Sequence, residues 1–198
     1  TRARMKFSRS FYLVVTAAAL LAGAAIAWSI AARRDAPDEA TYVPKPVKIT
    51  PEIELLQRYL RIDTSNPPGN ETAGARFLID ELLRRGIRAE LIESAPGRGN
   101  VYARLKGRRS GEGLLLLHHI DVVPALPEGW KAPPFAGALW LDMLVGRGAL
   151  DMKSVGIAQL EAFTAVARAG RSPERDVVFL AVADEETGEE YEIICVKA

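Results

Sequence analysis

Cysteine, histidine and net charge are all scarce in this chain, and the scarcity excludes several classes of protein. Cys195 is the only cysteine among 198 residues. An intrachain disulfide framework and a thiolate zinc cage are therefore excluded, and we expect Cys195 to be a small apolar residue in a strand. The formal net charge is +1, and no block of basic residues interleaves with aromatic ones, so nucleic acid is not an expected partner. Apolar residues, in contrast, make up 48% of the chain, which is enough for a buried core.

Charge is missing altogether from residues 10–32, a stretch rich in Ala, Leu and Val. A helix of this length crosses the roughly 30 Å hydrocarbon core of a membrane. The excess of basic residues before the stretch predicts a cytoplasmic N-terminus, with the rest of the chain periplasmic or extracellular. We therefore expect residues 1–34 to be a membrane anchor. Two alternatives remain: a signal segment cleaved near Ala25-Ile26-Ala27, which would make the protein secreted, and a buried soluble helix.

The rest of the chain divides into a linker and one domain. Residues 35–50 contain prolines and scattered charges with little periodicity, as in a linker. A helix should begin after Thr50, which can cap it. Further helices are expected over 71–85 and 151–169. Strands with alternating apolar and polar residues are expected over 87–91 and 101–105, and apolar strands over 114–117 and 176–183. This alternation predicts, over residues 51–198, an α/β fold with a mixed, mostly buried sheet and helices on both faces. One hydrophobic N-terminal helix should precede it.

Three acidic motifs fall at the ends of strand-like or glycine-rich segments. His119 and Asp121 follow one apolar run. Glu185 and Glu186 follow another, and Asp151 comes after a glycine-rich loop. Because ligands of open α/β sheets gather beyond the carboxyl ends of strands, these side chains can meet on one rim. One imidazole with several carboxylates suits zinc or a similar divalent ion.

The neighbours of these residues refine the hypothesis. Asp121 lies two residues after His119 on the same strand face and can hold the second nitrogen of a metal-bound ring. One of the two adjacent glutamates can bind metal while the other moves a proton. His118 should point to the opposite side of the strand. A phosphate-binding loop before Lys153 is excluded, because Met152 stands where a second glycine is required.

Taken together and in this order, the motifs resemble the co-catalytic zinc peptidase family that includes aminoacylases, glutamate carboxypeptidases and succinyl-diaminopimelate desuccinylases. The resemblance is carried by residues 114–124, 130–135, 146–153 and 177–188, with a weaker likeness from residue 51 that includes 62–69. It implies a site with two zinc ions, for which Co²⁺ or Mn²⁺ are alternatives.

The same resemblance implies a role for each residue. His119 would bind one ion, oriented by Asp121, and Asp151 would bridge both ions. Glu185 would be the general base, and Glu186 would bind the second ion. The implied reaction is hydrolysis of an amide bond in an N-acyl amino acid or small peptide. An ester or acyl-diamine substrate is the alternative within this enzyme class.

The sequence departs from the family's pattern after the glutamate pair. The family adds a later acidic ligand, a histidine near its C-terminus and a separate dimerisation domain, and residues 189–198 resemble a strand instead. We therefore interpret residues 51–198 as the N-terminal part of a truncated catalytic domain with little or no activity, and expect a homodimer only for a full-length protein. The competing interpretation is a catalytically inactive, membrane-tethered remnant or binding module.

Overall fold

A computed structural model of the protein describes residues 42–187. Contacts group the chain into two units, Thr1–Pro44 and Lys45–Ala198. The helices of the second unit are α2 (Pro51–Leu60), α3 (Glu71–Arg84) and α4 (Ser154–Arg168). Its strands are β1 (Glu90–Glu93), β2 (Gly99–Leu105), β3 (Leu114–His119), β4 (Ala138–Trp140), β5 (Met143–Val145) and β6 (Val177–Val182).

The first two of these helices begin where the sequence predicts. Thr50 caps α2, since its side-chain oxygen accepts a hydrogen bond from the amide of Ile53 (3.4 Å). Pro51 suits the first position because it has no amide hydrogen to leave unpaired. Helix α3 begins at Glu71. Gly86 follows its end with a φ of 76°, a left-handed conformation that glycine adopts without strain.

The third helix begins later than the sequence predicts. The sequence predicts a helix over 151–169, but α4 starts at Ser154, because the backbone angles of Asp151 and Met152 are not helical. Asp151 thus lies in a distorted turn, Ala149–Lys153, that precedes the helix. The metal-binding hypothesis for Asp151 therefore rests on a turn and not on a helix face.

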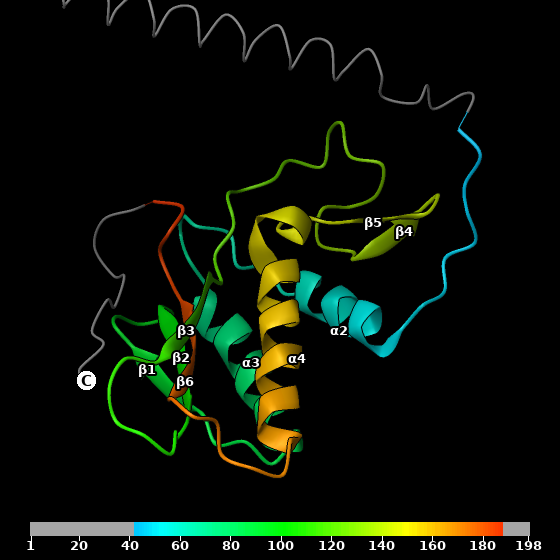
Figure 1. Ribbon diagram of the computed structural model, residues 1–198. Coiled ribbons are helices and arrows are strands. Elements are labelled where there is room, and N and C mark those ends of the chain that lie inside the picture. The colour runs from blue at the N-terminus through cyan, green and yellow to red at the C-terminus, as the bar shows by residue number, and fades with distance from the viewer. Residues whose placement is uncertain (1–41, 188–198) are drawn as a thin grey trace, which may run out of the picture. The chain divides into compact units, whose positions relative to one another are not determined.

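The sheet is mixed, as predicted, with the strand order β1-β2-β6-β3. Strands β3 and β6 are parallel, pairing Leu114 with Val177 at one end and His119 with Val182 at the other. Strand β2 is antiparallel to both of its neighbours. Because β3 and β6 are adjacent and parallel, their carboxyl ends meet at the same edge of the sheet (Figure 1). Strands β4 and β5 form a separate hairpin.

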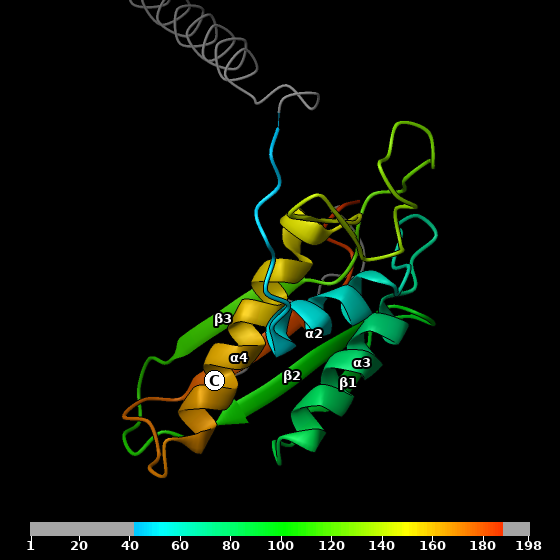
Figure 2. The same ribbon diagram turned by 90° about the vertical axis from the view of Figure 1, so that its right-hand side faces the viewer.

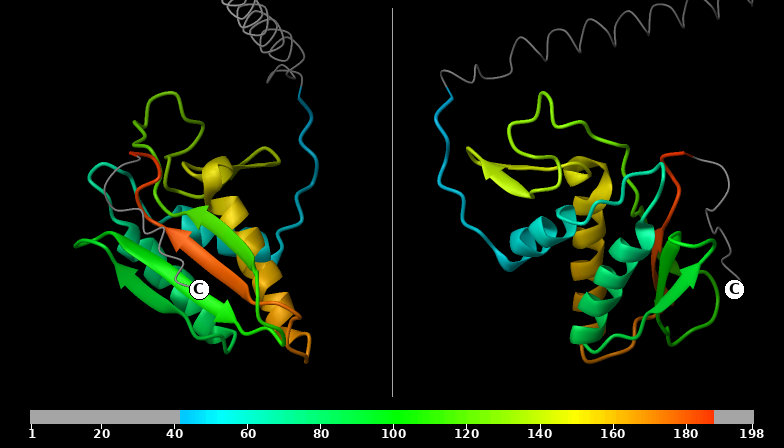
Figure 3. Two further views of the ribbon diagram at one scale, coloured as in Figure 1. Left: turned by 60° about the vertical axis from the view of Figure 1, so that its left-hand side comes forward. Right: turned by 180° about the vertical axis from the view of Figure 1, so that it is seen from behind.

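Helices α3 and α4 pack on one face of the sheet, and α2 lies on the same side (Figures 1 and 2). The core lies between these layers, where Leu78 of α3 and Phe163 of α4 are fully buried with Phe179 of β6. The prediction of helices on both faces is therefore wrong for residues 42–187, whose helices all lie behind the sheet in the left view of Figure 3.

The apolar run at 114–117 explains this error. A continuous apolar strand is typical of a sheet covered on both faces, yet Leu115 and Leu117 of β3 are 41% and 43% exposed. The apolar run shows that burial of β3 would be favourable. It does not specify which helix or strand would cover it.

Within the described residues, no helix combines the length and the apolar character needed to cross a membrane. The predicted span, residues 10–32, lies outside the described part of the chain, as do residues 189–198 with Cys195.

Candidate metal centre

His119 is the last residue of β3, and its ring is held at the carboxyl edge of the sheet. Its side chain is only 5% exposed. Nδ1 lies 2.9 Å from the backbone oxygen of Asp121 and 3.5 Å from its carboxylate. Since a carbonyl oxygen only accepts, Nδ1 carries the hydrogen and donates it. Nε2 is then the ring nitrogen that a cation could bind, in place of the proton that its contact with the Asp151 carboxylate requires.

Nε2 of His119 faces a group of carboxylates. It lies 3.1 Å from Oδ1 of Asp151 and 3.8 Å from Oε2 of Glu185. One ligand atom each from His119, Glu185 and Glu186 lies within 4.8 Å of the others. The structure therefore brings together all the residues that the sequence predicted as metal ligands, with the predicted base beside them.

Asp121 is the residue that connects the two strand ends. It is completely buried. Besides its contact with His119, its carboxylate accepts hydrogen bonds from the backbone amides of Glu185 (3.2 Å) and Glu186 (2.9 Å). Its role is therefore broader than the predicted one: the closest contact with the His119 ring comes from its main-chain oxygen, and its carboxylate holds the loop after β6.

The charges of this cluster influence one another. Burial raises the pKa of Asp121, but hydrogen bonds from His119, Asn66 and the two amides lower it to about 2. Burial lowers the pKa of His119, and its hydrogen bonds with Asp121 and Asp151 raise it to about 9. Burial and the surrounding carboxylates raise the pKa of Glu186. Such a concentration of negative charge favours a cation.

Asp151 is presented by a turn that is anchored through Lys153. Lys153 is completely buried. Its ammonium donates hydrogen bonds to the backbone oxygens of Ile62 (2.7 Å) and Tyr59 (3.3 Å) and lies 4.8 Å from the centre of the Tyr59 ring. Burial lowers its pKa to about 7. Oxygens at the end of α2 thus fix the turn, while the Asp151 side chain remains 79% exposed.

His118 lies on the opposite side of β3, as predicted. Its Nδ1 is 2.9 Å from Oε1 of Gln159 on α4, and its ring meets the Phe179 ring edge-on at 5.2 Å between centroids. Burial lowers its pKa to about 4. His118 is therefore a core residue between sheet and helix.

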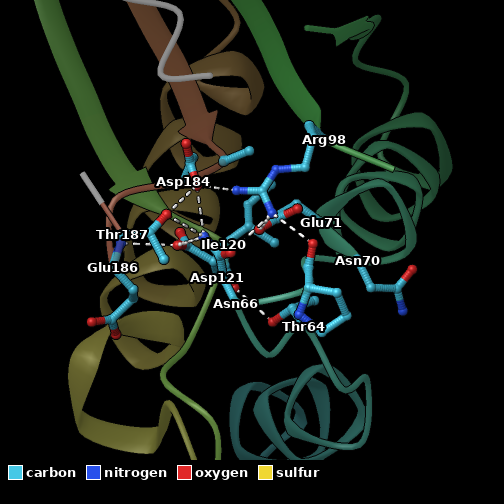
Figure 4. A network of polar contacts seen from close by, with 12 residues as sticks. Thr64, Asn66, Asn70, Glu71, Arg98, Ile120, Asp121, Asp184, Glu186 and Thr187 are labelled. Carbon is cyan, nitrogen blue, oxygen red and sulfur yellow. Dashed lines mark hydrogen bonds and ion pairs between the residues drawn. The ribbon is translucent and has the colours of Figure 1, made fainter. Parts of the chain in front are cut away.

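Sequence reasoning missed a second group of polar residues behind the site (Figure 4). The side-chain amide of Asn66 donates to Asp121 (3.0 Å) and to Asp184 (2.8 Å). Arg98 contacts both Asn66 and Asp184. Asn66 lies in the stretch 62–69, which carried only a weak likeness, and the sequence around Arg98 contains no signal for such a role.

Comparison with known proteins places this arrangement in context. A family model described as peptidase family M20/M25/M40 matches residues 115–193. Aminoacylase-1 of Sus scrofa is 34% identical over 140 residues, which are 70% of this chain and 34% of the relative. The crystal structure of an M20 family metallo-carboxypeptidase from Sulfolobus solfataricus is similar with a TM-score of 0.63 and 27% identity, over 72% of this chain and 33% of that chain. Human carnosine dipeptidase 1, at 23% identity over 71% of this chain and 33% of that chain, shares the fold with a TM-score of 0.54.

The structure places an imidazole and several carboxylates beyond the ends of two adjacent parallel strands. His119, Glu185 and Glu186 all lie in the part of the chain that the family model matches. The family match over residues 115–193 and the similar proteins confirm the predicted resemblance to the zinc peptidases of family M20/M25/M40. The chain spans about a third of the length of the curated relatives that it matches.

Proposed function

We propose that this chain supplies part of the active site of a metal-dependent hydrolase that cleaves amide bonds in N-acyl amino acids or small peptides. The observation that carries the proposal is the convergence of His119, Glu185 and Glu186 within 4.8 Å, with Asp151 3.1 Å from the His119 ring. Aminoacylases and a metallo-carboxypeptidase among the similar proteins support this reaction class.

The donor set fits zinc. One imidazole nitrogen and carboxylate oxygens are ligands that zinc accepts, and catalytic zinc sites have this composition. His119 and Glu186 would each hold an ion, and Asp151 would bridge the two ions. Bound zinc would polarise the amide carbonyl and lower the pKa of water.

The protein's own groups then have separate tasks. The Glu185 side chain is 55% exposed, so its carboxylate is accessible to substrate and solvent. It would hold the proton removed from the attacking water and deliver it to the leaving nitrogen. Asp121 fixes the backbone on which Glu185 is carried, through the 3.2 Å hydrogen bond from the Glu185 amide.

A substitution that removes only the proton transfer tests this assignment. Glu185→Gln in the full chain should lower kcat for N-acetyl amino acids by at least about 100-fold, since general acid–base catalysis contributes roughly 10²–10⁴-fold. Zinc affinity, measured by titration of the metal-free protein, should change little. Glu174→Gln is the control, because the Glu174 side chain is also 55% exposed but precedes β6 instead of following it.

Each outcome bears on a different part of the proposal. Loss of zinc together with activity in Glu185→Gln would make Glu185 a ligand instead of the base. If the parent chain neither binds zinc nor turns over substrate, the proposed function is overturned. The remnant or binding module is then favoured.

A further inference from the structure

An ion pair joins two strand ends directly behind the candidate metal centre. Arg98 immediately precedes β2, and Asp184 follows β6. These strands are antiparallel neighbours that pair Val101 with Ala181, so the two charged residues meet at the site edge of the sheet. The Arg98 guanidinium donates to the Asp184 carboxylate, and the two side chains are 7% and 5% exposed.

The guanidinium makes further contacts in this buried position (Figure 4). It donates to the side-chain oxygen of Asn66 (3.0 Å) and the backbone oxygen of Pro68 (3.3 Å). It also lies 3.2 Å from the carboxylate of Glu71, the first residue of α3. Arg98 thus ties the segment before α3 to the loop after β6.

The backbone around Arg98 leaves room for the guanidinium. Gly69 has a φ of 91°, and a Cβ at this position would lie 1.6 Å from Nη1 of Arg98. Only glycine combines that φ with that close approach. The local sequence is therefore matched to the buried cation, which is a second observation independent of its hydrogen bonds.

A short relay leads from Arg98 to the candidate base. Arg98 fixes the oxygen of Asn66 and so directs its amide group toward Asp121 and Asp184. Asp184 also accepts a hydrogen bond from the hydroxyl of Thr187, in the same loop. Asp121 in turn accepts the amides of residues 185 and 186. Arg98 itself touches none of the candidate metal ligands in these contacts.

We infer that Arg98 is a positioning residue that holds the Glu185–Glu186 loop in its catalytic geometry through Asn66 and Asp184. The inference deepens the proposed function and rests on it for its catalytic consequence. Hydrogen bonds behind a ligand orient it, and their loss lowers metal affinity by roughly 10–100-fold. A misplacement of about 1 Å in catalytic groups costs on the order of 100-fold in rate.

The same two strands contain a matched control. Arg104 of β2 pairs with Asp176, just before β6, at the end of the ladder away from the candidate site. Arg104→Gln therefore removes an Arg–Asp pair between the same two strands, at their opposite end, without touching the relay. The Arg104 side chain is 41% exposed, so Arg104→Gln should lower stability less than Arg98→Gln does.

The test compares Arg98→Gln, Arg98→Lys and Arg104→Gln in the full chain. Hydrogen exchange at the amides of Glu185 and Glu186, measured without metal, should quicken in Arg98→Gln and remain at the parent rate in Arg104→Gln. In the zinc-loaded protein, Arg98→Gln should lower kcat for N-acetyl amino acids by about 100-fold. KM should change by less than about threefold, because a loss confined to the transition state lowers kcat and kcat/KM together. Zinc affinity should fall about 10-fold, and Arg98→Lys should restore part of each loss.

The results separate three situations. Parent rates of exchange at both amides, with kcat and zinc affinity within twofold of the parent, would overturn the role of Arg98 even if the melting temperature falls. If Arg98→Gln does not fold, Arg98→Lys decides by the same criteria. A parent chain without zinc affinity or turnover overturns the proposed function, and the exchange comparison still decides whether Arg98 holds the loop.

Discussion

Glu71 is a carboxyl group with no exposed surface, next to the buried charges of Arg98, Asp121 and Asp184. Burial raises its pKa from 4.5 to about 7, and the neighbouring carboxylates add to the rise, while Arg98 opposes it. The folded chain therefore binds this proton more tightly than the unfolded chain. Stability from this group is complete below about pH 4.5 and is lost as the pH rises through about 7.

This sign predicts the behaviour of Glu71→Gln, which resembles the protonated form at every pH. Between pH 5 and pH 8 the free energy of unfolding of the parent should fall by roughly 1–3 kcal/mol more than that of the variant. Urea unfolding at the two pH values measures the difference. The exposed Glu54→Gln serves as control, and equal pH slopes in the parent and Glu71→Gln would contradict the prediction.

At the same scale, the residues of the site differ in how visible they are from sequence. His119, Asp151 and the glutamate pair could be predicted because each follows a recognisable strand or glycine-rich segment. Arg98 could not, because its partner Asp184 is 86 positions away and only the folded sheet brings them together. The sequence around Lys153 shows only a glycine-rich loop, and the burial of Lys153 at the end of α2 depends on contacts with Ile62, 91 positions away.

Elements were predictable where local signals are strong. Thr50 and Pro51 set the start of α2, and Gly86 follows the end of α3, because capping and glycine conformation are properties of a few adjacent residues. The second face of the sheet was predicted wrongly, since an apolar strand such as Leu114–Leu117 does not specify what covers it. The start of α4 was also missed, because the distorted turn at Asp151 depends on tertiary contacts.

The Ala149–Lys153 turn supplies a prediction about one element. Lys153→Met removes the two hydrogen bonds to the end of α2 and should let the turn move, so zinc affinity should fall about 10-fold. The free energy of unfolding should change by less than about 1 kcal/mol, because the variant also removes a buried ammonium that is costly to desolvate. Chelator competition and urea unfolding measure the two effects.

The exposed Lys106→Met is the control for this experiment, since the Lys106 side chain is 72% exposed. Zinc affinity equal to the parent in Lys153→Met would show that the turn holds Asp151 without its lysine. A large loss of stability in the same variant would indicate that Lys153 mainly supports the core.

For the whole molecule, we propose that residues 10–32 anchor the chain in a membrane with the catalytic part outside the cytoplasm, because this stretch carries no charge and follows a basic segment. The expressed full chain should then sediment with membranes and resist alkaline extraction. Protease added outside should degrade the part beyond residue 45. A shorter secreted product would support cleavage instead, and a full-length chain in the soluble fraction would contradict both.

Asp121 couples the position of His119 to the positions of Glu185 and Glu186, because it is hydrogen-bonded to all three residues. Its backbone oxygen accepts a hydrogen bond from the His119 ring, and its carboxylate accepts hydrogen bonds from the amides of Glu185 and Glu186. A shift of the loop after β6 would therefore displace Asp121, which also orients the His119 ring. Damage to either strand end should consequently spread to the other, so losses from combined substitutions should fall short of the sum of the separate ones.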